Sequence, residues 1–246
     1  MPTSASERTG RGSSRTAVVW SGLEPLLGRA VGEPRDVLDI GGGTGGLAVR
    51  VGALGHRVTV VDPSPDALAA LDRRAREHDV AVTGRQGDLS SLLDVVEPDS
   101  ADVVLCHGVL EVVDDPVGAL ATLVRVVRPG GVLSLVVAQR HAAVVARAMA
   151  GHVQQALALL DSEPTPSPGR TGRRYTHDEI TALVDGAGFA VESVHAVRVF
   201  TDLVPGSLLD LEPGAPAALV ELEQAVATRP EYLPLAAQLH LLAHLP

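Results

Sequence analysis

Short apolar runs alternate along the chain with longer segments in which apolar residues recur at helical spacing. The continuous apolar runs predict β-strands over residues 36–40, 57–61, 80–85, 101–106 and 132–138. Helical spacing predicts helices over residues 16–30, 47–54, 62–77, 89–96 and 117–127. Because the strands are apolar throughout rather than at every second residue, we expect a parallel sheet that is covered on both faces.

The regular alternation of strands and helices ends after the fifth predicted strand. Residues 142–160 predict one long helix, and a loop rich in Pro, Gly and Arg follows. Thr176 and Glu179 form a capping box for a helix that ends near Gly186 or Gly188. A helix over residues 215–227 then lies between two strands, predicted at residues 191–200 and 235–245. The pattern predicts an α/β fold: a Rossmann-like, doubly wound, seven-stranded sheet, mostly parallel with the last strand antiparallel, and a helical and loop insertion after strand 5.

The turn after the first predicted strand is almost devoid of side chains. Its sequence is Asp39-Ile40-Gly41-Gly42-Gly43-Thr44-Gly45-Gly46. Glycine adopts positive φ and lacks the Cβ that would hold a ligand away from the backbone. The helix that follows would direct its free N–H groups toward such a ligand. The pattern therefore predicts a nucleotide-like cofactor, and a glycine turn without a ligand is the simpler alternative.

Two cofactor classes fit the glycines alone. Gly41-x-Gly43-x-x-Gly46 matches the dinucleotide fingerprint, with Asp62 at the end of the next strand to hold a ribose hydroxyl. The same residues match D-x-G-x-G-x-G, in which Asp39 precedes the glycines. An acid at that position suits a cationic cofactor. Asp88 follows the third strand, where it would accept from an adenine amine, and the Arg-Pro-Gly-Gly turn at residues 128–131 precedes the fifth strand.

Together these motifs resemble the class I S-adenosylmethionine methyltransferase family over nearly the whole chain. The resemblance is closer to the tRNA 5-carboxymethoxyuridine methyltransferase family, through residues 107–116, 128–135, 197–202, 219–222, 229–232 and 239–240. It implies cofactor contacts from Arg15, Gly41, Gly42, Asp62, Asp88 and His107. The chain departs from that family at Thr44, where an acid is frequent. Its aromatic content of 2% also leaves few residues for base stacking.

Each candidate cofactor residue has a structural alternative. Asp62 would accept from the ribose hydroxyls or cap the next helix, and Asp88 would meet the adenine or cap the helix after it. Asp39 would lie near the cationic end of the cofactor or brace the turn. Arg15 would pair with the cofactor carboxylate. The predicted cofactor-binding residues are Arg15, Asp39, Gly41, Gly42, Gly43, Gly45, Asp62, Pro63, Asp88, Leu89 and His107.

No catalytic residue is assigned, and no metal site is expected. His107, Arg198 and Tyr175 are candidates for positioning the substrate. Arg198 would hold a carboxylate or else be a surface residue of strand 6, and Tyr175 is alternatively a packing residue. The window 164–177 contains no acid, so Arg170, Arg173 and Arg174 are candidates to contact phosphate or carboxylate, or else form a solvated loop.

Composition limits the function classes. A net charge of −10 argues against a broad nucleic-acid surface and against DNA as a partner. No apolar run approaches roughly 20 residues, so no membrane span is expected. The polar N-terminus lacks the apolar centre of a signal peptide, and the single Cys106 fits a reducing, cytoplasmic location as a core thiol.

The expected organisation is a flexible tail over residues 1–14, or a lid ordered by ligand, and a single methyltransferase domain over residues 15–246. A substrate cap would occupy about residues 141–175. The expected function is methylation of a carboxylate of a modified wobble uridine in tRNA. A small metabolite as acceptor, a nicotinamide-dependent oxidoreductase and a cofactor-binding protein without catalysis are the alternatives.

Overall fold

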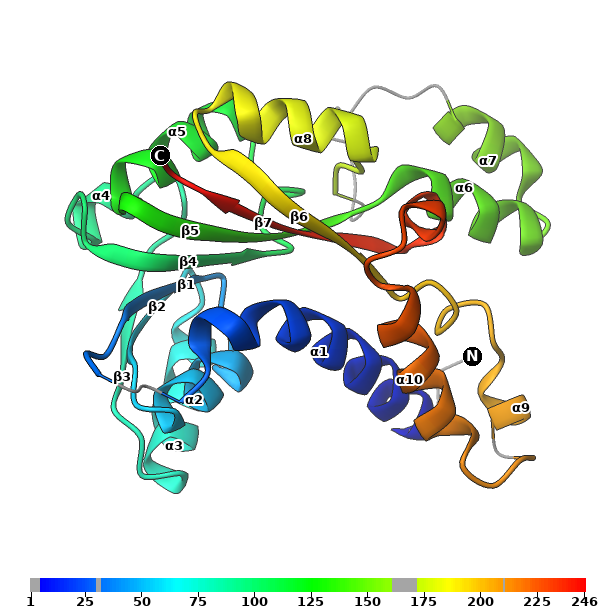
Figure 1. Cartoon of the computed structure of the whole chain (residues 1–246), viewed down its shortest axis with the longest axis horizontal. Coiled ribbons are helices and arrows are strands. Elements are labelled where there is room, and N and C mark those ends of the chain that lie inside the picture. The colour runs from blue at the N-terminus through cyan, green and yellow to red at the C-terminus, as the bar shows by residue number, and fades with distance from the viewer. Residues whose placement is uncertain (1–4, 30–31, 161–171, 210) are drawn as a thin grey trace. The chain divides into compact units, whose positions relative to one another are not determined.

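The computed structural model describes residues 5–29, 32–160, 172–209 and 211–246 (Figure 1). The chain divides into two compact units. The sheet unit comprises residues 24–136, 181–193 and 241–246, and the helical unit comprises residues 1–23, 137–180 and 194–240.

The strands form one seven-stranded sheet in the order β3-β2-β1-β4-β5-β7-β6. Their bounds are β1 Asp36–Ile40, β2 Arg57–Asp62, β3 Val82–Gln86, β4 Ala101–His107, β5 Val127–Ala138, β6 Ala190–Val197 and β7 Gln238–His244. Strands β1 to β5 pair in parallel. Beside β5, Gly130 N donates to Leu245 O and Leu245 N donates to Gly131 O, which is the pattern of an antiparallel neighbour. The predicted α/β fold, mostly parallel with an antiparallel last strand, is confirmed.

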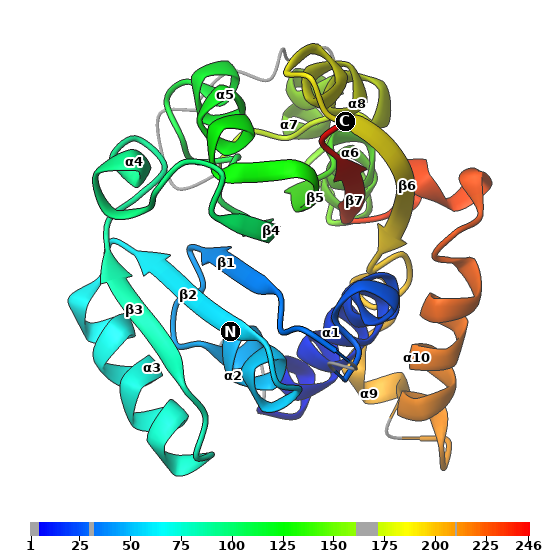
Figure 2. The ribbon, with the colours of Figure 1, turned by 60° about the vertical axis from the view of Figure 1, so that its left-hand side comes forward.

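Helices and strands alternate from α1 to β5, and three helices follow β5. They are α1 Ala5–Leu27, α2 Gly46–Ala53, α3 Pro65–Glu77, α4 Leu92–Val95, α5 Pro116–Val126, α6 Arg140–Met149, α7 Val153–Leu160, α8 His177–Gly186, α9 Gly206–Leu209 and α10 Ala215–Val226, with a 3₁₀ helix η1 at Pro230–Leu235. Helix α3 runs alongside β3 (Figure 2). It begins where Ser64 Oγ accepts from Ala67 N and Pro65 occupies the first turn, and it buries Leu71 and Ala75.

Strand β4 lies in the centre of the sheet and is among its most buried segments. Val103, Val104, Leu105 and Cys106 are all fully buried there. Burial raises the pKa of the Cys106 thiol to about 12. The side chain therefore packs as a small apolar residue, as the sequence predicts.

The predicted long helix over residues 142–160 is wrong, because the segment forms α6 and α7. Gly151 lies between them with φ +80°, and His152 N donates to Arg147 O across the end of α6. This is the Schellman arrangement, in which a left-handed glycine ends a helix. The apolar periodicity continues through Gly151, but the helical backbone conformation ends there.

Other boundaries also differ. Helix α1 begins at Ala5, within the segment 1–14 expected to be a tail, and includes Pro25. Strand β6 ends at Val197, three residues early, and β7 begins at Gln238 because η1 occupies the residues before it. Helix α9 and η1 have no counterpart among the predicted elements. In the part of the chain that the structure describes, no helix has both the length and the apolar character needed to cross a membrane.

Candidate functional site

The sheet unit contains a cavity of about 780 Å³ at the carboxyl ends of its parallel strands. Gly41 follows β1, Asp62 ends β2, Asp88 follows β3 and His107 ends β4, and all four line the cavity. Pro63 and Leu89 line it as well. Ligands of open α/β sheets bind at this edge. The volume is within the range of small-molecule sites.

The glycine turn needs its glycines for two different reasons. Gly41, Gly43 and Gly45 have φ of +68°, +55° and +75°. A Cβ on Gly41 would lie 2.6 Å from a methyl carbon of Val109 in the cavity wall, whereas a Cβ on Gly45 would lie 2.0 Å from Leu71 Cδ1. Gly41 therefore shapes the cavity, and Gly45 allows α2 to begin against α3.

Asp62 is buried beside the cavity and holds two backbone segments. Its Oδ2 accepts from Gly43 N at 2.9 Å, and its Oδ1 accepts from Ser64 N at 2.9 Å. A carboxylate has about four acceptor sites, so two of them are left for the hydroxyl groups of a ligand. The residue therefore braces the turn, and its contact with a ribose stays a prediction.

Asp88 lines the cavity and organises the turn before α4, while its contact with the adenine stays a prediction. Its Oδ1 accepts from Ser90 Oγ at 2.6 Å, from Ser90 N at 2.9 Å and from Ser91 N at 3.1 Å, which organises the turn before α4. The Ser90 hydroxyl and the backbone N–H of Ser91 hold the pKa of Asp88 below its ordinary value, against some desolvation. Asp88 is therefore an ionised acceptor at the cavity.

His107 is fixed by a residue on the neighbouring strand. Its Nε2 lies 2.8 Å from Ser134 Oγ, and Ser134 is fully buried in β5. This contact sets the orientation of the imidazole at the edge of the cavity. A residue held in this way is suited to positioning a ligand.

Several predicted cofactor residues do not line the cavity. Gly42, Gly43, Gly45 and Asp39 are not among the lining residues. Asp39 is buried, and a Cβ on Gly42 would lie 2.6 Å from its Oδ2, so the carboxylate packs directly under the turn. A direct contact of these four residues with the cofactor stays a prediction.

The sequence interpretation missed the wall that follows β4. It consists of Gly108, Val109, Val112, Val113, Asp114, Asp115 and the first turns of α5. Val112 is 71% exposed although it is apolar. An apolar run that continues past the carboxyl end of a strand is the signal that could have identified this wall.

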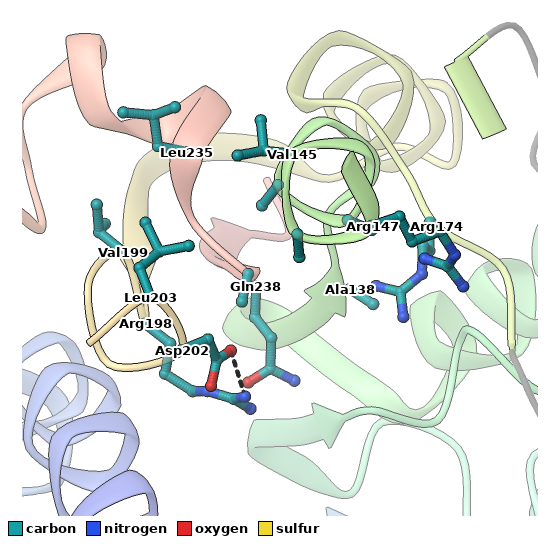
Figure 3. Close-up of a pocket in the computed structure, with 14 residues that line it drawn as sticks. Ala138, Val145, Arg147, Arg174, Arg198, Val199, Asp202, Leu203, Leu235 and Gln238 are labelled. Atoms are coloured by element: carbon teal, nitrogen blue, oxygen red, sulfur yellow. Dashed lines mark hydrogen bonds and ion pairs between the residues drawn. The ribbon is translucent and has the colours of Figure 1, made fainter. Parts of the chain in front are cut away.

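The helical unit has a cavity of its own, of about 300 Å³. Arg147 and Arg174 approach it from one side, and Arg198, Asp202 and Gln238 from the other (Figure 3). Arg198 was expected on strand 6, which is wrong, since β6 ends before it. Its guanidinium Nη2 pairs with Asp202 Oδ2 at 2.5 Å.

The remaining predicted residues also lie in the helical unit. Arg15 Nε donates to Gln238 Oε1 at 2.9 Å, and its pairing with the cofactor carboxylate stays a prediction. Tyr175 is buried, and its backbone forms an isolated parallel β-bridge with Gln139, which fits the packing alternative. Arg173 is 5% exposed, which does not fit a phosphate contact. Arg170 lies outside the described residues.

Comparison with known proteins assigns the class. Residues 38–135, which carry the glycine turn, Asp62, Asp88 and His107, match the family model described as a methyltransferase domain. Within the described ranges, no group of three or more His, Cys, Asp or Glu side chains could hold a metal ion. The chain is an S-adenosylmethionine-dependent methyltransferase, as predicted.

Individual relatives extend the similarity. The chain is 29% identical to the tRNA 5-carboxymethoxyuridine methyltransferase of Escherichia coli K12, over 97% of this chain and 90% of the relative. It is 40% identical to the ubiquinone biosynthesis O-methyltransferase of Alkalilimnicola ehrlichii over 40% of each chain. Among solved structures, magnesium protoporphyrin IX methyltransferase from Synechocystis shares the fold with a TM-score of 0.63 and 15% identity, over 100% of this chain and 90% of that one.

Proposed function

We propose that the enzyme methylates a carboxylate of a modified wobble uridine in tRNA. The observation that carries this proposal is the similarity along almost the whole chain to an enzyme named for 5-carboxymethoxyuridine in tRNA. The similarity to the ubiquinone O-methyltransferase is stronger locally but spans 40% of the chain. A partial match of that kind supports methyl transfer without identifying the acceptor.

The cofactor cavity fits S-adenosylmethionine. We assign Asp62 to the ribose hydroxyls and Asp88 to the adenine, because both are acceptors in the cavity wall. Gly41 would keep Val109 in place in the cavity wall, since a Cβ there would collide with the Val109 side chain. Gly42, Gly43 and Gly45 would form the rest of this turn, and Asp39 would support it from below. Arg15 keeps its assignment to the cofactor carboxylate.

The chemistry requires little from the protein beyond alignment. S-adenosylmethionine supplies a methyl group that is already electrophilic on its sulfonium. When a carboxylate oxygen attacks in line, the O–C bond forms as the S–C bond breaks, and no proton is transferred. A carboxylic acid of ordinary pKa is ionised near pH 7, so a general base is unnecessary. His107, held by Ser134, would position the reacting groups.

A small carboxylate metabolite is the second candidate acceptor. The net charge of −10 and the aromatic content of 2% favour it, because RNA binding usually relies on basic surface and stacking aromatics. Either acceptor would use the same cofactor cavity and the same displacement.

The test is methylation of tRNA from a strain that lacks the corresponding gene. The purified enzyme and S-adenosylmethionine should add one methyl group to a uridine derivative, detected by mass spectrometry of the nucleoside digest. Mild alkali should remove that methyl group if it is a carboxylate ester, whereas an ether or N-methyl group would persist. The Asp62→Ala variant serves as the cofactor-deficient control. A digest without any new methylated nucleoside would favour the metabolite.

A further inference from the structure

Arg198 is held in an unusual backbone conformation at the edge of the helical-unit cavity. It follows β6 with φ +60°, a left-handed conformation that a non-glycine residue rarely adopts. Such a conformation persists only where the surroundings fix it, and such residues cluster at functional sites. The question is what fixes Arg198 and what the arrangement presents to the cavity.

Glu223 of α10 fixes the segment that follows Arg198. Its fully buried carboxylate accepts from the backbone N–H groups of Val199, Phe200 and Thr201 at 2.8, 3.0 and 2.8 Å. It also accepts from the Thr201 hydroxyl at 2.6 Å. Four hydrogen bonds to one buried carboxylate define the loop on which both Arg198 and Asp202 are carried.

The Arg198 guanidinium keeps binding capacity in this arrangement. Its Nη2 donates to Asp202 Oδ2, while its Nε is buried without an acceptor among the described residues. Buried donors usually have a partner, so an unpaired one at a cavity indicates a missing acceptor. A guanidinium fork presents two parallel N–H groups that match the two oxygens of a carboxylate.

The rest of the cavity suits a flat group with one acidic substituent. Arg147 and Arg174 lie across from Arg198, and Asp202 is the one acid among the lining residues, so the lining is net positive. Apolar side chains complete the wall: Val145, Val199, Leu203 and Leu235 (Figure 3). A free phosphate would use the arginines but leave this apolar wall without a contact.

We propose that this cavity binds the acidic pyrimidine of the acceptor, with Arg198 holding its carboxylate. Asp202 then acts as an internal competitor, which occupies the guanidinium until a ligand carboxylate replaces it. The inference rests on the proposed function, because that function supplies a uridine bearing a carboxylate. It adds the residue that would distinguish this acceptor from an unmodified uridine.

Calorimetry with the nucleoside 5-carboxymethoxyuridine, on the full chain saturated with S-adenosylhomocysteine, tests the assignment. Uridine and inorganic phosphate are the comparison probes. Arg198→Gly suits the observed φ and should fold normally, but it should lose about tenfold or more in affinity for the acidic nucleoside because a charge-assisted pair is removed. Asp202→Asn removes the competitor and should bind it several-fold more tightly.

Asp79→Gly is the matched control, because Asp79 also has a positive φ, of +53°, and follows α3, far along the chain from this loop. It should bind the nucleoside as the unaltered protein does. Opposite effects of Arg198→Gly and Asp202→Asn on affinity would support the proposal. If the ion pair were purely structural, both substitutions would weaken binding. Unchanged affinity in Arg198→Gly, or phosphate bound as tightly as the acidic nucleoside, would overturn it.

The tRNA assay separates this inference from the proposed function. If the unaltered enzyme methylates tRNA and Arg198→Gly has the same KM, the cavity assignment fails while the function stands. If the unaltered enzyme leaves tRNA unmethylated, the acceptor proposal fails, whatever the variants bind.

Discussion

Gly43 N donates to Asp62 Oδ2 at 2.9 Å, and this hydrogen bond joins the glycine turn after β1 to the end of β2. The other oxygen of Asp62 accepts from Ser64 N, just before α3 begins. One carboxylate therefore fixes the turn, holds the residue that caps α3 and lines the sheet-unit cavity. The helix-cap alternative for Asp62 is wrong, because Ser64 caps α3, and the contact of Asp62 with the ribose stays a prediction.

Replacing Asp62 with Ala should weaken S-adenosylhomocysteine binding by about tenfold or more, because hydrogen bonds to a charged group contribute about 1.5–3 kcal/mol. Calorimetry measures this directly. Asp72→Ala, which removes an exposed ion pair with Arg76 on α3, is the control and should bind normally. Equal affinities in the two variants would rule out the assignment of Asp62 to the ribose.

Gly45→Ala should destabilise the protein more than Gly151→Ala. Both glycines have positive φ, of +75° and +80°, so both substitutions introduce the same backbone strain. A Cβ at Gly45 would also overlap Leu71, whereas one at Gly151 meets nothing within 4 Å. Overpacking typically costs about 1–3 kcal/mol, and the difference in the free energy of unfolding between the variants should be of that size. Denaturation in urea measures it, and equal losses would show that the contact with Leu71 relaxes freely.

Acidification should destabilise the protein through His195. This buried imidazole stacks on His240 with ring centroids 5.3 Å apart, and desolvation lowers its pKa, partly offset by a hydrogen bond with the His240 backbone. The unfolded chain, with a pKa of about 6.5, then binds a proton more readily than the folded protein. Stability contributed by neutral His195 is complete above that pH and is lost as the pH falls below it.

The measurement compares the melting temperatures of the unaltered protein and His195→Asn at pH 8 and pH 5.5. On acidification, the melting temperature of His195→Asn should fall less than that of the unaltered protein. His78→Asn is the control, since His78 is exposed at the end of α3. An acid-induced loss that is the same in all three proteins would assign the pH dependence to other groups.

Glu223→Gln should lower the free energy of unfolding by about 1–3 kcal/mol, the usual cost of leaving a buried donor without a partner. The amide nitrogen of Gln would face backbone N–H groups that now meet a carboxylate oxygen. Glu221→Gln is the matched control on the same helix, because Glu221 is exposed. Urea denaturation of both variants provides the comparison, and a neutral Glu223→Gln would show that the loop is fixed by other contacts.

The sequence predicts the lining of the sheet-unit cavity in part, because local rules bring its acidic residues and His107 to one edge. Apolar runs locate the parallel strands, and residues that follow parallel strands meet at one edge, so Asp62, Asp88 and His107 come together as expected. The division between lining and supporting residues is less predictable. Whether Gly45 faces a ligand or Leu71 depends on the packing of α2 against α3, and no local pattern records that contact.

The helical-unit cavity depends on contacts between residues far apart in the sequence, and for that reason it could not be predicted. Val197-Arg198-Val199 has the alternation of a strand, but Glu223, 24 residues away along the chain from Val199, draws the backbone out of β6. Arg173 looks like a loop residue by composition and is nevertheless buried. The end of α6 is different, because Gly151 interrupts the apolar pattern just after the helix and is a local signal for its end.

The burial of Cys106 makes the chain convenient for spectroscopy. Maleimides react with exposed thiolates, and the native thiol, fully buried with a pKa of about 12, offers neither exposure nor charge near neutral pH. A cysteine introduced at exposed Asp72 in the sheet unit and another at Leu211 in the helical unit would carry spin labels selectively. Pulsed electron paramagnetic resonance on that doubly labelled protein would report the distance between the units with and without S-adenosylhomocysteine.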